Sequence, residues 1–231
     1  MPGNDSTRIS THGPVAEDGR ALGARIFIER RMGRLVSGEE LRLLFGAQMM
    51  VGRDKTCDIC VPDDRISRKH ALIRIDGDAV RLADLGSTNG STRNDERVND
   101  EIIIETGDQV QFGQAVTYDV RIVERNGAIS SVRLANGSEG YLLVPQELII
   151  GFADPKNLDV DLKIYDPSIL PRHARIEFFS GMTYILSLNP DRPVVVNSAP
   201  VREIELRNDF LIEIGDTLIR WERDQQTHTQ T

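Results

Sequence analysis

Three short stretches in the first half of the chain carry side chains that could bind an anion. Arg53 follows a glycine at the end of an apolar run. Ser67 and Arg68 open an S-R-K-H stretch, and Thr88 lies in an S-T-N-G stretch. A guanidinium presents a planar fork of N–H donors, to which hydroxyl groups add further donors. Such a set suits a phosphate group, which carries about −1.5 to −2 charge and strong acceptor oxygens.

Two cysteines close to Arg53, Cys57 and Cys60, raise the possibility of redox chemistry or of zinc binding. A structural zinc site needs four ligands, and the chain has no second cysteine pair and only four histidines, which are widely separated. A small buried thiol is therefore the preferred interpretation, and a thiol–disulfide activity is kept only as a minor alternative. The chain also lacks a catalytic triad, a P-loop and a kinase signature. We predict no enzyme, no catalytic residue, no metal and no cofactor.

The elements that must position these side chains are predicted to be almost all β. Short β-branched runs, partly alternating and separated by Gly, Asp or Asn, follow one another closely, and no window sustains a helical period. The clearest runs are ARIFIERR (24–31), ELRLLF (40–45), QMMVG (48–52), HALIRID (70–76), AVRLADL (79–85), EIIIETG (101–107) and YDVRIVE (118–124). Many short strands at close spacing indicate a sandwich or a barrel.

The same order of strands recurs in the second half of the chain. ISRKHALI is echoed by ILPRHARI, so that His70 and His173 are 103 residues apart, and Asn94 and Asn197 have the same offset. A repeat of about 100 residues indicates two copies of one domain. We expect domains at 23–125 and 126–224, with a short linker at 126–127. The polar ends, 1–22 and 225–231, are predicted to be disordered tails.

The order and spacing of these motifs in residues 24–124 resemble those of the forkhead-associated (FHA) domain. That family is a β-sandwich whose loops at one end bind phosphothreonine peptides, so two consecutive FHA-type β-sandwiches are expected here. The resemblance implies that Arg53 and Ser67 contact the phosphate, often with Arg68 and Thr88. It implies that Asn89 binds the peptide backbone. It also implies a set of residues that shape the loops without touching the ligand: Gly52, His70, Gly90 and Asn94.

The second copy has lost the candidate phosphate donors. At the positions of Arg53, Ser67, Arg68 and Thr88 it has Phe152, Leu170, Pro171 and Asp191. The scaffold positions His173 and Asn197 remain. We expect a degenerate FHA-like domain that binds no phosphopeptide, although Arg172 and Arg192 could in principle bind an anion. Phe152 and Leu170 either form an apolar contact surface or fill their own loops.

The composition and charge of the chain argue against nucleic acid and membranes as partners. The chain has 231 residues with 28 Lys plus Arg and 36 Asp plus Glu, which gives a formal net charge of −8. General nucleic-acid binding needs a clustered excess of basic residues, so it is not expected. No apolar run approaches the roughly 18 residues that span a bilayer, and a cytoplasmic location without membrane contact is expected.

Together these observations predict a non-catalytic adaptor in Ser/Thr-kinase signalling. Its first domain would bind a phosphothreonine-containing protein, either a Ser/Thr protein kinase or a substrate of one. Its second domain would be a phosphate-independent interaction module. The alternative is a phosphate-independent structural component of a secretion or regulatory complex. Arg53 and Ser67 favour the first hypothesis, because a phosphate-independent scaffold has no need of them.

Overall fold

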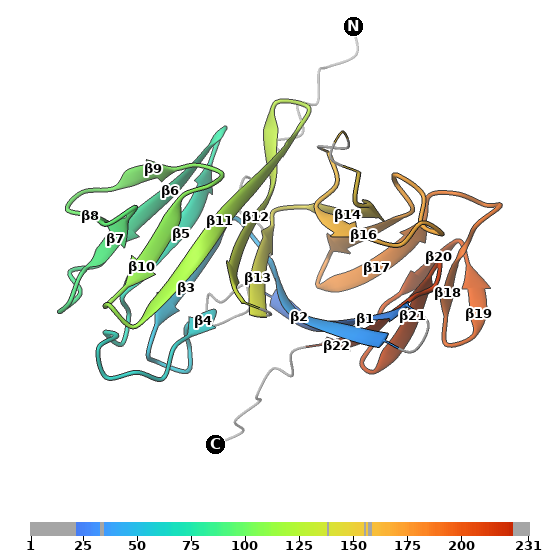
Figure 1. Ribbon diagram of the computed structural model, residues 1–231, viewed down its shortest axis with the longest axis horizontal. Coiled ribbons are helices and arrows are strands. Elements are labelled where there is room, and N and C mark those ends of the chain that lie inside the picture. The colour runs from blue at the N-terminus through green and yellow to red at the C-terminus, as the bar shows by residue number, and fades with distance from the viewer. Residues whose placement is uncertain (1–21, 33–34, 138, 155, 157–158, 224–231) are drawn as a thin grey trace, which may run out of the picture.

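The computed structural model describes residues 22–32, 35–137, 139–154, 156 and 159–223, and this part of the chain folds as β-strands joined by turns (Figure 1). The predicted tails lie outside the described residues, apart from Leu22. Within the described part of the chain there is no helix, and so none of the length and apolarity that crossing a membrane requires. The predicted all-β fold is confirmed.

Twenty-two strands occupy the described residues. Those that precede residue 126 are β1 (Leu22–Met32), β2 (Leu35–Phe45), β3 (Gln48–Gly52), β4 (Ile59–Cys60), β5 (Ala71–Asp76), β6 (Ala79–Asp84), β7 (Ser91–Arg93), β8 (Glu96–Arg97), β9 (Ile102–Ile104), β10 (Gln109–Phe112) and β11 (Val116–Arg125). Those that follow are β12 (Ala128–Asn136), β13 (Glu139–Val144), β14 (Glu147–Phe152), β15 (Leu162–Ile164), β16 (Ala174–Phe179), β17 (Met182–Ser187), β18 (Val194–Val196), β19 (Ala199–Val201), β20 (Glu203–Glu205), β21 (Phe210–Ile214) and β22 (Thr217–Arg223).

These strands form one long sheet and two smaller ones. The long sheet has twelve strands in the order β19-β18-β21-β22-β1-β2-β13-β12-β11-β10-β7-β8. Each smaller sheet has five strands, β4-β3-β5-β6-β9 in the first half and β15-β14-β16-β17-β20 in the second. The matching strand orders are those of two sandwiches of the same kind, as the sequence repeat predicts.

Each five-stranded sheet encloses its own hydrophobic core against the long sheet. The first core contains Met49 and Ile73 of the small sheet with Val132 and Leu134 of β12. The second core contains residues of β14 to β22 and six residues from the N-terminal hairpin, namely Ala24, Ile26, Ile28, Leu41, Leu43 and Phe45. We call β3 to β13 the first module, and β1, β2 and β14 to β22 the second module.

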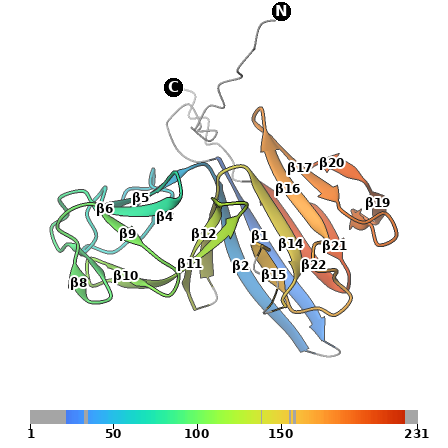
Figure 2. The ribbon, with the colours of Figure 1, turned by 90° about the horizontal axis from the view of Figure 1, so that it is seen from above.

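The two sequence repeats therefore exchange their first two strands. The hairpin β1–β2 opens the first repeat, yet it pairs with β22 at the end of the second. The hairpin β12–β13 opens the second repeat, yet it pairs with β11 at the end of the first (Figure 2). The predicted division at 125/126 follows the sequence repeat, whereas the packing places 22–45 mainly in the second core and 128–144 mainly in the first.

A tight turn accounts for the pairing of β11 with β12. Asn126 and Gly127 both have positive φ, 56° and 75°, as the two central residues of a type I′ hairpin turn require. This local turn brings β12 onto the free edge of β11, whereas pairing β1 with β11 would close a loop of most of a repeat. The pair 126–127, predicted to be a linker, is a hairpin turn.

The strands at the centre of the long sheet are buried on both faces. β2 pairs with β13 in parallel, with Leu43 opposite Leu142 and Leu44 opposite Leu143. Leu43 and Leu142 belong to the second core, and Leu44 and Leu143 to the first. Because neighbouring residues of a strand point to opposite faces, the two cores lie on opposite faces of this sheet. That is why both strands are continuously apolar here instead of alternating.

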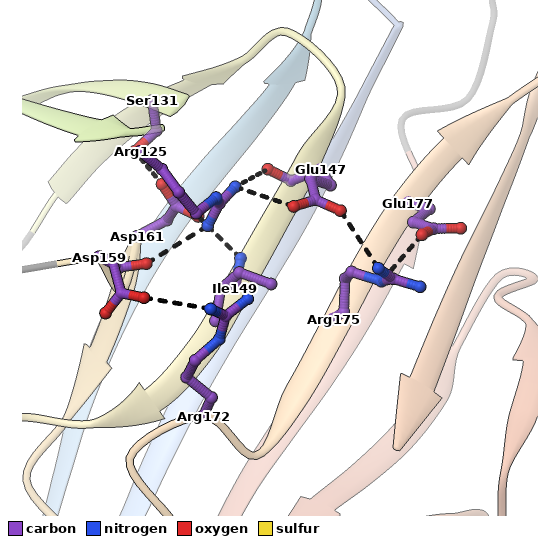
Figure 3. Close-up of polar contacts among 9 residues, drawn as sticks. All are labelled: Arg125, Ser131, Glu147, Ile149, Asp159, Asp161, Arg172, Arg175 and Glu177. Atoms are coloured by element: carbon purple, nitrogen blue, oxygen red, sulfur yellow. Dashed lines mark hydrogen bonds and ion pairs between the residues drawn. The ribbon is translucent and has the colours of Figure 1, made fainter. Parts of the chain in front are cut away.

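A buried ion pair joins the turn region to the second module (Figure 3). The Arg125 guanidinium at the end of β11 lies 3.1 Å from the fully buried carboxylate of Asp161 and 3.2 Å from that of Glu147. Ser131 Oγ and the backbone N–H of Ile149 also donate to Asp161, at 2.7 and 2.8 Å. Asp161 therefore accepts hydrogen bonds from residues of β11, β12 and β14. Because these bonds have a defined geometry, the cluster fixes β11 and β12 against the second module.

Candidate functional site

The structure brings the predicted anion-binding residues of the first module together at one end of the sandwich. Arg53 follows β3, and its backbone N–H donates to the carbonyl of Ser67 at 2.9 Å. Ser67 Oγ in turn accepts the backbone N–H of Thr88 at 3.1 Å. Three separate loops are therefore joined through Ser67. Its hydroxyl hydrogen is not used in that bond and can be donated to a ligand.

The approach of two of these loops requires a glycine at position 52. A Cβ atom there would lie 2.2 Å from the carbonyl oxygen of Arg68, well inside contact distance. The same carbonyl accepts the N–H of Asp54 at 3.1 Å. The Arg68 side chain is exposed in this arrangement, and it follows Ser67 directly in the chain. Gly52 therefore permits the close approach of these two loops and contributes no side chain of its own.

His70 holds the loop of Ser67 against the loop of Thr88. It is completely buried; its Nδ1 accepts the N–H of Ser67 at 3.1 Å, and its Nε2 lies 3.2 Å from the carbonyl oxygen of Gly90. An accepting Nδ1 leaves the ring proton on Nε2, where it can be donated to Gly90. Gly90 has φ of 78°, which an L-residue rarely adopts. His70 and Gly90 thus connect the two loops through buried hydrogen bonds.

Asn89 and Asn94 are placed differently. Asn89 is exposed beside Thr88, and its Nδ2 donates to the carbonyl of Arg65 at 2.7 Å. Asn94 has φ of 50° in the turn between β7 and β8, where its side chain binds Asp108 and the backbone of Gln109. Asn89 is therefore accessible to a ligand that binds at these loops, while Asn94 stabilises a neighbouring turn.

Asp84, whose role is not evident from the sequence, organises the S-T-N-G turn. Its carboxylate accepts the N–H and Oγ of Ser87 at 2.8 and 2.7 Å and the Oγ of Ser91 at 2.6 Å. Burial alone would raise the pKa of Asp84, but these hydrogen bonds and nearby His70 outweigh it and hold the pKa below its usual value. An aspartate three residues before a serine is a signal for such a turn.

A second acidic residue missed from the sequence, Asp64, pairs with the candidate phosphate-binding arginine. Arg53 Nη1 lies 2.9 Å from Asp64 Oδ1, and the Asp64 side chain is 98% exposed. A ligand phosphate that binds this guanidinium through Nη1 competes with Asp64 for that donor. Exposed pairs of this kind are weak, so the displacement costs little.

The buried cysteine near this site is structural. Cys57 is buried, its Sγ lies 3.2 Å from the carbonyl oxygen of Arg68, and burial raises its pKa to about 11. A thiol with so high a pKa is a poor nucleophile and a poor metal ligand at neutral pH. No group of three His, Cys, Asp or Glu side chains in the described part of the chain is placed to hold a metal ion.

The second module keeps the same loop framework around different side chains. Phe152 donates its N–H to the carbonyl of Leu170 at 2.9 Å, as Arg53 does to Ser67. A Cβ at Gly151 would lie 2.0 Å from the carbonyl oxygen of Pro171, which matches the approach at Gly52. Phe152 is partly buried and packs against the second core, so its ring mainly fills its own module. Arg172 is paired with Asp159 at 3.1 Å (Figure 3).

Comparison with known proteins identifies both modules. The FHA domain matches the chain at residues 49–113 and again at 149–215, together more than half of its length. FHA domain-containing protein FhaA of Mycobacterium tuberculosis is 38% identical over 79 residues, which are 34% of this chain and 15% of that protein. Glycogen accumulation regulator GarA of Mycolicibacterium smegmatis is 40% identical over 63 residues, 27% of this chain and 39% of that protein.

Among solved structures, the FhaA FHA domain complexed with the intracellular domain of Rv3910 is similar to part of the chain. It is 26% identical and covers 37% of this chain and 90% of that one, with a TM-score of 0.33. The matched segment thus spans less than half of the length of each of the two curated relatives above.

Proposed function

Because the chain belongs to the FHA domain family, we propose that its first module binds a phosphothreonine-containing protein, either a Ser/Thr kinase or a substrate of one. Arg53 and Ser67 bind the phosphate, with Arg68 and Thr88 beside them, and Asn89 binds the peptide backbone. The chain acts as a non-catalytic adaptor.

One observation carries this proposal: the hydrogen-bonded connection of Arg53, Ser67 and Thr88. The backbone N–H groups of Arg53 and Thr88 donate to Ser67, so that the three loops that carry a guanidinium and two hydroxyls lie next to one another. Arg68, which follows Ser67, carries a further cation. Charge-assisted hydrogen bonds from such a set favour an anion with several oxygens. The hydrogen bonds of His70 and Asp84 hold the loops of Ser67 and Thr88 together without a ligand, which supports the proposal.

The experiment is calorimetry of the full chain with a phosphothreonine peptide selected from an oriented library, and with its unphosphorylated form. Loss of one charge-assisted bond weakens binding by about tenfold or more, so Arg53→Ala should do at least that. Arg172→Ala, which removes an exposed loop arginine from the second module, is the matched control and should leave the affinity unchanged. Equal affinity of wild type and Arg53→Ala would refute the site.

The second module is proposed to be a phosphate-independent interaction module. Phe152, Leu170 and Pro171 stand where the first module has its donors, and Asp191 would repel a phosphate. The competing function is a scaffold in which neither module recognises phosphate. Binding of the unphosphorylated peptide by the first module, as tight as that of the phosphorylated one, would favour the scaffold.

A further inference from the structure

An arginine outside the three candidate phosphate loops lies beside the loop that carries Asn89, the proposed peptide-binding residue. Arg97 belongs to β8, the short strand at the edge of the long sheet, where it is paired with Thr92 of β7 (Figure 1). β7 begins directly after Gly90. The pairing of β7 with β8 therefore brings Arg97 back to the end of the loop that carries Asn89.

The guanidinium of Arg97 occupies the space that a side chain at Gly90 would fill. A Cβ atom at Gly90 would lie 2.9 Å from Nη2, 3.0 Å from Cζ and 3.3 Å from Nε of Arg97. Because glycine has no Cβ, the planar group can lie against the loop, next in the chain to Asn89. Arg97 is nevertheless exposed, so its N–H donors remain accessible to a ligand.

These donors are unused within the part of the chain that the structure describes. No carboxylate there lies within ion-pair distance of Arg97, and its side chain makes no hydrogen bond. By contrast, Arg65, whose carbonyl binds Asn89, lies 2.7 Å from a carboxylate, and Arg93 of β7 lies 2.9 Å from another. Glu96 is opposite Arg93 and points to the other face of β8, so it does not neutralise Arg97.

The second module has lost this arginine together with the phosphate donors. The offset of 103 residues that relates Asn94 to Asn197 aligns Arg97 with Pro200 and Gly90 with Pro193. β18 and β19 are paired there as β7 and β8 are in the first module, so this strand pair forms without the arginine. Of the two modules, only the one with the candidate phosphate donors has Arg97 and the glycine against which it packs. This difference favours a role in ligand binding over a role in folding.

We propose that Arg97 binds a carboxylate side chain of the phosphothreonine peptide, so that the first module selects acidic segments. With Asn89 on the peptide backbone, a Glu or Asp side chain near that point accepts from the N–H groups of the Arg97 guanidinium. A neutral side chain gains no such bond, and a basic side chain is repelled. This inference rests on the phosphothreonine recognition proposed for the first module, to which it adds the chemistry of the residues that flank the phosphothreonine.

The test is calorimetry of the full chain with phosphothreonine peptides in an alanine background. Each peptide carries one Glu, placed in turn at every position around the phosphothreonine, and has a matched Gln peptide. At one position Glu should bind about two- to fivefold more tightly than Gln, a modest factor because Arg97 is exposed. Arg97→Gln should abolish this preference, and Arg97→Glu should replace it with a preference for Lys. Arg207→Gln, which removes an exposed arginine of the second module, should leave it unchanged.

The affinity for the Gln peptides should be the same in Arg97→Gln as in the wild type, which separates loss of the contact from loss of the fold. Equal affinity for Glu and Gln at every position, or a Glu preference that persists in Arg97→Gln, would overturn the proposal and leave phosphothreonine recognition standing. A preference that depends on Arg97 but is the same in the unphosphorylated peptides would instead refute phosphothreonine recognition and leave the acidic contact standing. Absence of binding by all of these peptides would refute both.

Discussion

At the scale of single residues, the candidate phosphate-binding arginine already has a carboxylate partner before any ligand binds. Arg53 is paired with Asp64, and the pair is exposed to solvent. Replacing Asp64 with Asn should free the guanidinium and raise the affinity for the phosphothreonine peptide. Because exposed ion pairs are weak, the expected gain is about two- to fivefold. Calorimetry at low and at high salt measures it.

The gain should shrink at high salt, where the wild-type pair is already screened. Asp63→Asn is the companion variant, because Asp63 pairs with Arg65 instead. A weaker affinity in Asp64→Asn would mean that Asp64 positions Arg53 and does not compete for it.

Asp84 supports the site through its serine contacts, and this support depends on pH. Its pKa is lower in the folded protein than in the unfolded chain, so its contribution is complete above the unfolded value of about 4 and is lost as the pH falls. Asp84→Asn should cost about 1.5 kcal/mol of unfolding free energy at neutral pH. Urea titrations at neutral pH and in the acid range should show the difference between variant and wild type disappearing in acid. A pH-independent difference would contradict this account.

The sequence was informative for those residues whose type and spacing are themselves the signal. Arg53, Ser67 and Thr88 could be proposed as phosphate-binding residues because the family motif fixes their order. The pairing of Arg53 with Asp64 could not be, since it depends on how two loops approach in space. Asp84 was visible inside the turn motif, but its role follows only from the positions of both serines that it binds.

At the scale of elements, two glycines perform the same task in the two modules. Gly52→Ala would drive a Cβ against the Arg68 carbonyl and displace the loop that carries Ser67, so phosphopeptide binding should be largely lost. Gly151→Ala creates the equivalent clash with Pro171 in the second module. It should lower the melting temperature similarly while leaving phosphopeptide affinity unchanged. Calorimetry and thermal unfolding of both full-length variants measure the two effects.

Gly77→Ala is the control for this pair, because nothing lies near its Cβ position and it is remote from the loops. Only the positive φ of 65° should then cost stability, by about 1 kcal/mol. Loss of phosphopeptide binding in Gly151→Ala would show that strain in one module reaches the site in the other.

Strands were predictable from their own residues, whereas their partners were not. The run 48–52 was expected and is β3, and the runs 79–85 and 101–107 contain β6 and β9. The pair Asn126 and Gly127 was interpreted as a linker, although Asn-Gly between apolar strands favours a hairpin. Equivalent strands of the two repeats compete for the same position, and this competition decides which core a hairpin completes. The hydrophobic pattern of a single strand does not show the outcome of that competition.

At the scale of the whole molecule, the exchange makes each module depend on residues from the other repeat. Ile26 in the first repeat is buried in the second core, and Leu134 in the second repeat is buried in the first. Truncating either side chain to alanine leaves a cavity and costs about 2–5 kcal/mol. The size of this loss does not distinguish the exchanged arrangement from two separate domains that exchange no strands. The core that is destabilised does distinguish them.

Hydrogen exchange of the full-length variants provides that location. Ile26→Ala should accelerate exchange of the β14, β16 and β17 amides, which enclose the second core, while β3, β5 and β6 stay protected. Leu134→Ala should do the reverse and should also weaken phosphopeptide binding, because the loops of Ser67 and Thr88 rest on the first core. In two domains without strand exchange, Ile26 would pack in the first core and Leu134 in the second. The hydrogen-exchange patterns of the two variants would then be interchanged. Faster exchange of β3 and β5 in Ile26→Ala, with β14 unaffected, would therefore rule out the exchange and return the hairpin to its own repeat.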